Sequence, residues 1–300
     1  MSDISSSAPS AGDGAVAVIS GLQAVTDRYD VLLCDVWGVL HDGLTAFPEA
    51  GDALARFRAQ GGTVVLITNA PRPHGEVRVM LERLRARPDA FDAIVTSGDV
   101  TRGEIAARRG LPVWHLGPDR DLPVFDGLDV SLSTLDDAAY VVCTGLFDDD
   151  RETPADYAGR LDIMAERRMT MVCANPDLVV ERGSDLIYCA GSLAAAYEAA
   201  GGRTIYAGKP YGPIYTRAVE SAAAVRGAAP DTRRVLAIGD ALRTDIAGAR
   251  QAGFDSLFVA RGIHAAEALD GEGRLEERRL SAWLADQPLT PTVAIERLVW

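Results

Sequence analysis

Lysine is almost absent from this 300-residue chain. Of its 30 basic residues, 29 are arginine and one is lysine, Lys209 in the segment AGKP. Lysine is a compact point charge on a slender stem, whereas arginine carries a broad planar fork. A crowded anion pocket beside carboxylates would require the slender side chain. The alternative is chance, because a single remaining lysine must stand somewhere.

Positive charge as a whole is scarce. The 30 basic residues face 43 acidic ones, which gives a net charge of −13 and a pI near 4.8. An acidic surface repels phosphate backbones and anionic lipid, so we expect no nucleic-acid partner and no membrane partner. An anionic substrate must therefore be attracted by local positive features.

The chain has few cysteines and no long apolar run. Its four cysteines, Cys34, Cys143, Cys173 and Cys189, form no C-x-x-C pair, which argues against a zinc knuckle or a disulfide framework and suits a reducing compartment. Three of the four lie in or beside apolar runs, which predicts buried thiols. No apolar stretch approaches the ~20 residues of a membrane span. The first residues, MSDISSSAPSAGDG, hold an acid and no base, unlike a secretory or mitochondrial leader. We expect a cytoplasmic protein with a flexible tail over residues 1–20.

Short β-rich runs alternate with helical segments, a pattern typical of a parallel α/β sheet. We expect strands at 31–34, 63–67, 93–95, 140–143, 169–173, 203–206, 235–238 and 256–259. We expect helices at 48–59, 75–87, 193–200, 213–225 and 244–251. The segment 101–200 is longer than one crossover needs. The prediction is an α/β fold with a doubly wound parallel-sheet core, residues 21–100 and 201–300, and an inserted α/β domain at 101–200.

Polar residues follow four of these runs directly. LLCD ends in Asp35, VVLITN in Thr68 and Asn69, IYAGK in Lys209, and VLAIGD in Asp240. Ligands of open α/β sheets bind beyond the carboxyl ends of the strands. One aspartate there is weak evidence, because aspartate commonly caps the next helix. Four such ends together predict a functional site.

These motifs resemble those of the haloacid-dehalogenase-like (HAD) hydrolase superfamily. The matching segments are DVWGVLHDG at 35–43, ITNA at 67–70, GKP at 208–210 and GDALRTDIAGARQAG at 239–253, in the family's order. NPD at 175–177 and AGSLAAAYE at 190–198 resemble the capped class IIA branch, which includes nitrophenyl-phosphatase-like and phosphoglycolate-phosphatase-like enzymes. The resemblance implies a Rossmann-like core and an α/β cap that closes over the site and excludes water.

The resemblance also implies a reaction, the Mg²⁺-dependent hydrolysis of a small phosphorylated metabolite. Asp35 would be the nucleophile and form an aspartyl-phosphate that water hydrolyses. Asp240 and Asp245, with Asp35 and the backbone carbonyl of Trp37, would hold Mg²⁺, a hard cation that prefers oxygen ligands. Asp245 could instead serve as a partner of its helix dipole.

Further residues are assigned to the substrate by the same resemblance. Thr68 and Asn69 would donate hydrogen bonds to phosphoryl oxygens, and Lys209 would stabilise charge on the transferring group. Asn175, Asp177 and Arg182 are the candidates in the cap, where Arg182 could pair with a second anionic group. Relatives of this branch often form homodimers through the cap. The acidic run at 148–150 is interpreted as a solvated loop, with a metal site as the alternative.

Position 37 departs from the family pattern. Phosphatases of this superfamily carry a second aspartate two residues after the nucleophile, as general acid and then base, and this chain has Trp37 there. Loss of a general acid costs about 10²–10⁴-fold, mostly for poor leaving groups.

Three interpretations of this departure stay open. His41 or Asp42 could replace the acid, although both are equally well explained as part of a turn before Gly43. The enzyme could act on activated phosphates or on a non-phosphate electrophile, with a bias toward good leaving groups. The protein could also be a phosphometabolite-binding module without turnover, although the retained nucleophile, lysine and metal pair favour an enzyme.

Overall fold

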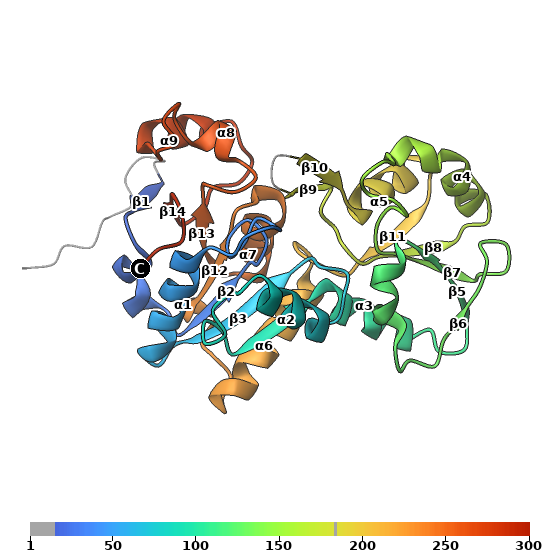
Figure 1. The fold of residues 1–300 in the computed structure, drawn as a ribbon, viewed down its shortest axis with the longest axis horizontal. Coiled ribbons are helices and arrows are strands. Elements are labelled where there is room, and N and C mark those ends of the chain that lie inside the picture. The colour runs from blue at the N-terminus through green and yellow to red at the C-terminus, as the bar shows by residue number, and fades with distance from the viewer. Residues whose placement is uncertain (1–15, 183–184) are drawn as a thin grey trace, which may run out of the picture.

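Two parallel sheets divide the protein into two lobes (Figure 1). The computed structural model describes residues 16–182 and 185–300. In this part of the chain, a seven-stranded sheet forms the core lobe and a five-stranded sheet forms the cap lobe. A hairpin of strands β9 (Val179–Arg182) and β10 (Asp185–Tyr188) lies between them (Figure 1).

The core sheet has seven strands, and the carboxyl ends of three of them lie side by side at one edge. The strands are β1 Ala17–Ile19, β14 Val293–Ile295, β13 Asp255–Val259, β12 Val235–Gly239, β2 Val31–Cys34, β3 Thr63–Thr68 and β4 Ala93–Thr96, in this spatial order. Every neighbouring pair is parallel. Because β2 lies between β12 and β3, the residues that follow these three strands meet at one edge of the sheet.

Side chains of β2 alternate between two apolar layers. Leu32 and Cys34 pack with the layer of helices α1 (Pro48–Ala59) and α2 (His74–Arg83). Val31 and Leu33 pack against α6 (Gly212–Arg226) on the opposite face. Successive strand residues point to opposite faces, so helices on both sides are needed to bury them. This is the doubly wound α/β core that the sequence predicts; its other helices are α7 Ala247–Ala252, α8 Ala265–Ala268 and α9 Glu277–Ala285.

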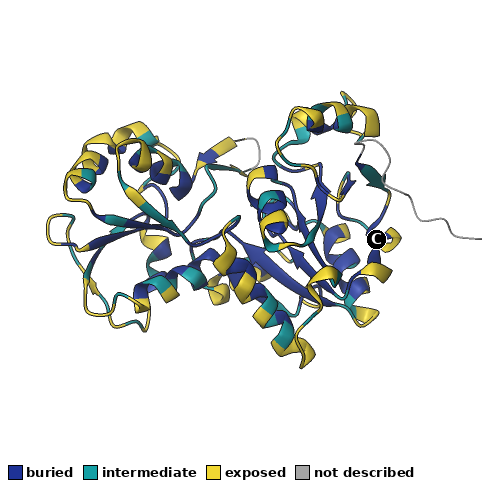
Figure 2. Cartoon of the chain, turned by 180° about the vertical axis from the view of Figure 1, so that it is seen from behind, coloured by how far each residue is buried: buried dark blue, intermediate teal, exposed yellow. Residues whose placement is uncertain are grey.

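The cap sheet is likewise parallel and covered on both faces. Its strands are β11 Arg203–Tyr206, β8 Thr170–Cys173, β7 Tyr140–Cys143, β5 Pro112–Leu116 and β6 Ser131–Leu132, in this order. Helices α4 (Ala158–Glu166) and α5 (Ala190–Ala199) pack on one face. Helix α3 (Ser97–Ala106) packs on the other face and also contacts α6 of the core. Figure 2 shows the central strands of both sheets buried beneath helices whose outer faces are exposed.

Two assignments made from the sequence are wrong. Residues 17–19, which were assigned to the tail, form β1 because they pair with β14; residues 1–15 lie outside the described residues. Residues 203–206, which were assigned to the core, pair as β11 with β8 of the cap sheet. The chain therefore returns to the core only after Tyr206.

The remaining predicted strands and helices are present, and several short ones were missed. All eight predicted strands occur within one residue of their expected ends. Strands β1, β5, β6, β9, β10 and β14 and helices α3, α4, α8 and α9 were not predicted. Most of these are short or carry polar residues, so their hydrophobic periodicity is weak.

The cysteines are buried and unpaired, as expected. Burial raises the pKa of the Cys143 thiol to about 12, so it packs as a neutral group. Within residues 16–182 and 185–300, no helix is both long enough and apolar enough to cross a bilayer.

The central position of β2 generates a stability prediction. Leu32 is fully buried, whereas Leu44 is 63% exposed. We expect Leu32→Ala to lower the free energy of unfolding by about 2–5 kcal/mol, because it leaves a cavity in the core. Leu44→Ala, the control, should change it by no more than about 0.5 kcal/mol. Urea unfolding of both variants measures this, and equal losses would contradict the assigned core.

Candidate active site

Three adjacent strands bring polar side chains to one edge of the core sheet. Asp35 follows β2, Asp240 follows β12, and Thr68 and Asn69 stand at the end of β3. Each of these residues is at most 6% exposed. The polar groups are thus buried together at the boundary between the core and the cap.

Lys209 reaches this edge by a route that the sequence analysis did not predict. It follows β11 of the cap sheet, so it lies on the link from the cap back to the core and not at a core strand end. Its Nζ donates to Asp35 Oδ1 and to Asp245 Oδ1, each at 2.6 Å. With 2% exposure, the ammonium is enclosed by the carboxylates that it neutralises.

Asp245 lies in a π-helical turn, Leu242–Ile246, where the sequence analysis expected an α-helix from residue 244. Its Oδ2 accepts a hydrogen bond from the Ala241 N–H at 3.1 Å. A Cβ on Gly239 would come within 2.0 Å of Asp245 Cγ, so only glycine leaves room for this carboxylate.

Asp240 is enclosed in a similar way. Its Oδ2 accepts from the Ile263 N–H at 2.8 Å. A Cβ on Gly38 or on Gly262 would lie within about 2.1 Å of that oxygen. Glycines therefore leave space for the carboxylate on both sides.

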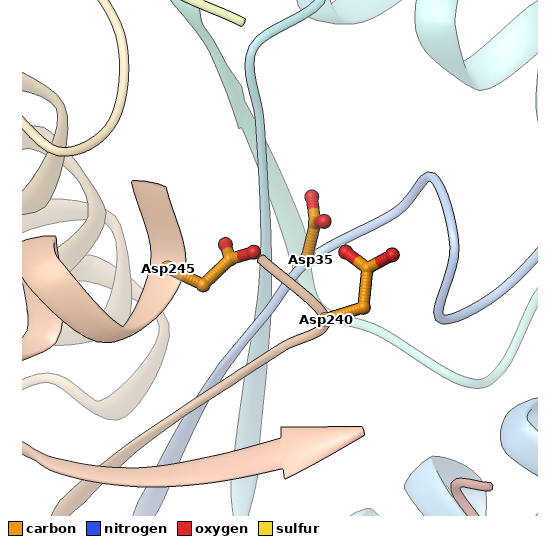
Figure 3. A group of neighbouring side chains, drawn as sticks. All are labelled: Asp35, Asp240 and Asp245. Carbon is orange, nitrogen blue, oxygen red and sulfur yellow. The ribbon is translucent and has the colours of Figure 1, made fainter. Parts of the chain in front are cut away.

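The three carboxylates lie beside one another (Figure 3), and oxygens of Asp35, Asp240 and Asp245 lie within 4.8 Å of each other. Burial, followed by the charge of Asp245, raises the pKa of Asp35 well above its usual value, against the lowering effect of Lys209. Burial and Asp245 likewise raise the pKa of Asp240 to about 7. The single positive charge of Lys209 does not balance the negative charges of three carboxylates. The cluster of hard oxygen donors therefore fits a divalent cation of the magnesium type.

The side chain of Asn69 joins the core to the cap. Its Nδ2 donates to Asp177 Oδ1 at 2.9 Å and to the Lys209 carbonyl at 3.2 Å, and its Oδ1 accepts from the Lys209 N–H at 2.7 Å. Asn175 Oδ1 accepts from the Asp177 N–H at 3.1 Å. Both amide hydrogens of Asn69 are thus already used. This disfavours the predicted contact between its side chain and phosphate.

Trp37 fastens the core to the cap hairpin. Its Nε1 donates to the Glu181 carbonyl of β9 at 2.5 Å. The indole packs on Gly43, where a Cβ would come within 2.5 Å of the ring, and its centroid lies 5.1 Å from that of His41. The side chain at the position of the missing aspartate therefore has a structural task of its own.

His41 and Asp42 have contacts that do not suit a proton donor. His41 Nδ1 accepts from the Gly43 N–H at 2.8 Å, and burial lowers the pKa of His41 to about 4. Burial raises the pKa of Asp42, but hydrogen bonds from the N–H groups of Leu44 and Thr45 bring it below its usual value. At neutral pH one is a neutral imidazole and the other an ionised carboxylate, so neither is a good acid.

Two cavities adjoin this cluster. The smaller, about 90 Å³, is lined by Asp35, Lys209 and Asp240 of the site and by Asp177 and Glu181 of the cap. The larger, about 390 Å³, extends beneath the cap, and its lining includes Thr68, Asn69, Asn175, Asp177 and Arg182. The structure thus brings the cap candidates from the sequence to the same region as the core motifs.

The larger cavity contains arginines that the sequence analysis did not identify. Arg72 and Arg120 line it beside Arg182. Arg182 pairs with Asp149 at 3.2 Å and Asp150 at 2.7 Å, and Arg120 also pairs with Asp149. The acidic run at 148–150 is therefore anchored by cap arginines and is not simply solvated. Arginine is common along this chain, so no sequence signal distinguished these two.

A parallel-sheet core that gathers carboxylates and a lysine beneath an inserted cap defines a class of capped hydrolases, and comparisons with known proteins agree. Residues 32–131 match the family model for haloacid dehalogenase-like hydrolases, and residues 206–281 match a second HAD-hydrolase-like model. A haloacid dehalogenase-like hydrolase from Brucella suis 1330 has 44% identity and a TM-score of 0.84, over 94% of this chain and 100% of that one. This chain belongs to the haloacid dehalogenase-like hydrolase family.

Two curated relatives are phosphatases by name. D-glycerol 3-phosphate phosphatase of Mycobacterium tuberculosis is 28% identical over 267 residues, which are 82% of this chain and 67% of the relative. Ribonucleotide monophosphatase NagD of Escherichia coli is 24% identical over 241 residues, 80% of this chain and 90% of the relative. The family resemblance seen in the motifs is thus confirmed.

The Trp37 contact generates a prediction about the hairpin. Trp37→Phe removes the hydrogen bond to the Glu181 carbonyl but keeps an aromatic ring on Gly43. We expect amide hydrogen exchange in β9 and β10 to become about five-fold faster, since a typical hydrogen bond contributes about 1 kcal/mol. Trp283→Phe, in the aromatic cluster beside Phe258, is the matched control. Unchanged exchange in the hairpin of Trp37→Phe would show that this contact does not hold the cap.

Proposed function

We propose that this protein is a Mg²⁺-dependent phosphatase of small phosphorylated metabolites that acts through an aspartyl-phosphate on Asp35. The observation that carries the proposal is the buried ammonium of Lys209 between Asp35 and Asp245, with Asp240 beside them at a cavity. The phosphatase names of the curated relatives support the reaction class.

The hydrogen bond from Lys209 to Asp35 supports a choice of reacting oxygen. Lys209 holds Oδ1, so Oδ2 is the oxygen that attacks phosphorus while the bond to the leaving oxygen breaks. Water then releases inorganic phosphate and restores the carboxylate. The Thr68 hydroxyl accepts from the Ala70 N–H at 3.2 Å and has its own hydrogen to offer a phosphoryl oxygen.

The metal would be held by Asp35, Asp240, Asp245 and the backbone carbonyl of Trp37. When bound, Mg²⁺ neutralises charge on the phosphoryl oxygens. The chain's own contribution is to hold oxygens of three carboxylates within 4.8 Å of one another in a buried site. This local cation, together with Lys209, would overcome the repulsion that a net charge of −13 exerts on an anionic substrate.

The larger cavity would hold the leaving group. Asn175, Asp177 and Arg182 line it, and a volume of about 390 Å³ suits a small metabolite. Because Arg182 is already paired with Asp149 and Asp150, its contact with a second substrate anion would require exchange of these partners. We also propose that the protein is cytoplasmic and forms a homodimer through the cap.

The nucleophile assignment can be tested with p-nitrophenyl phosphate and a panel of metabolite phosphates. We expect Asp35→Asn to reduce phosphate release by several orders of magnitude, because the amide is not a nucleophile. Asp52→Asn, at a partly exposed position of α1, should retain activity. Phosphate release that persists in Asp35→Asn would contradict the mechanism. Lack of turnover in unmodified protein that binds Mg²⁺ would favour a binding role or a non-phosphate electrophile.

The metal assignment can be tested by titration calorimetry without any substrate. We expect Asp240→Asn to weaken Mg²⁺ binding by at least ~10-fold, because it removes one anionic ligand from a buried site. Asp52→Asn serves again as the control, and EDTA should abolish phosphate release by the unmodified protein. Equal Mg²⁺ affinity in the two variants would show that the ion binds elsewhere.

A further inference from the structure

The cap contributes a carboxylate to the cavity of the nucleophile. Asp177 lies in the loop between β8 and β9, and it lines the same cavity as Asp35, Lys209 and Asp240. Trp37 leaves the core without its usual proton donor. We propose that Asp177 replaces that donor and acts as the general acid and then the general base, an inference that rests on the phosphatase function proposed above.

Asp177 is fixed relative to the nucleophile by a short chain of contacts. Its Oδ1 accepts from Asn69 Nδ2, and Asn69 Oδ1 accepts from the Lys209 N–H. The ammonium of the same lysine holds Asp35. Among the described residues, the hydrogen bonds of the Asp177 carboxylate involve Oδ1, which leaves Oδ2 for the substrate.

The in-line geometry of phosphoryl transfer requires the proton donor on the side of phosphorus away from Asp35. In phosphoryl transfer the attacking and leaving oxygens lie roughly in line through phosphorus. The leaving oxygen, and later the attacking water, therefore occupy the face opposite Asp35. One group on the cap can serve both steps, and Asp177 is a cap carboxylate in the wall of the cavity that Asp35 also lines.

The surroundings of Asp177 favour a proton-carrying carboxyl. Burial raises its pKa to about 6, against the lowering effects of Lys209 and of the hydrogen bond from Asn69. A general acid works best when its pKa lies near the working pH. The charge of Asp245 also raises the pKa of Asp177. The charge of Asp177 in turn raises the pKa values of Asp240, Cys173 and Cys189.

The proton balance closes over one turnover. As Asp35 Oδ2 bonds to phosphorus, the bond from phosphorus to the leaving oxygen breaks, and that oxygen takes the electron pair and the proton of Asp177. Water then bonds to phosphorus and gives a proton to the Asp177 carboxylate, while the Asp35–phosphorus bond breaks. The products are the alcohol and inorganic phosphate, with both aspartates restored.

Glu181 provides a matched control for this assignment. It is the other cap carboxylate in the wall of the small cavity. Its backbone carbonyl is held by Trp37, but its side chain is exposed to solvent. Among the described residues no hydrogen bond holds its carboxylate, whereas Asn69 holds that of Asp177.

The experiment compares p-nitrophenyl phosphate, which has a good leaving group, with glycerol phosphate, an alkyl phosphate. Asparagine at position 177 keeps an oxygen for Asn69 but has no proton to transfer. We expect Asp177→Asn to reduce kcat/KM for glycerol phosphate by about 10²–10⁴-fold, and to reduce that for p-nitrophenyl phosphate far less. Glu181→Gln should keep the ratio of the unmodified protein. The decline of alkyl phosphate turnover above the pKa of Asp177 should also be absent in Asp177→Asn.

Each outcome decides between distinct explanations. An equal loss on both substrates in Asp177→Asn would mean that the residue only positions Asn69, and would overturn the proposal. A selective loss of alkyl turnover in Glu181→Gln would overturn it in favour of Glu181. Turnover of p-nitrophenyl phosphate by the unmodified protein tests the phosphatase function separately. If neither substrate is hydrolysed by that protein, both proposals fail.

Discussion

The salt bridges from Lys209 to Asp35 and Asp245 are the contacts on which the rest of the site depends. Three carboxylates buried within 4.8 Å repel one another, and their desolvation is costly unless a cation lies among them. Space for that cation is limited, because Lys209 is only 2% exposed and its Nζ lies 2.6 Å from an oxygen of each of two carboxylates. A slender ammonium enters such a space, whereas a planar guanidinium requires more room. The enclosure of this ammonium thus favours lysine over arginine at position 209.

Position 37 shows how a family pattern can change without dismantling the site. An aspartate there would present a carboxyl to the leaving group, but an indole makes a different contact, a hydrogen bond to the Glu181 carbonyl in the cap hairpin. The backbone carbonyl of residue 37 does not depend on the side chain. Tryptophan at this position thus adds a contact with the cap, and the carboxylate cluster is intact beside it.

Local sequence predicted the core strands and most of the site because both depend on short-range patterns. Apolar runs such as Val31–Cys34 are buried on both faces, and the polar residue that follows each run, such as Asp35, lies at the sheet edge. Contacts between distant segments could not be predicted. The hydrogen bond between Trp37 and Glu181 joins residues that are 144 positions apart in the sequence. Strand β11 pairs with β8 of the cap, a pairing that the sequence of β11 alone does not encode.

The site residues come from both lobes, so the proposed reaction depends on the position of the cap relative to the core. In the proposed mechanism the core holds the nucleophile and the carboxylate cluster, and Lys209, which joins Asp35 to Asp245, lies on the link from the cap back to the core. Asp177 accepts a hydrogen bond from Asn69 of the core, and the Glu181 carbonyl of the hairpin accepts one from Trp37. If Asp177 is the proton donor, as proposed, a cap that moves away would carry this donor with it and admit water, and the leaving group would receive no proton. Chemistry and the exclusion of water therefore depend on the same closed arrangement.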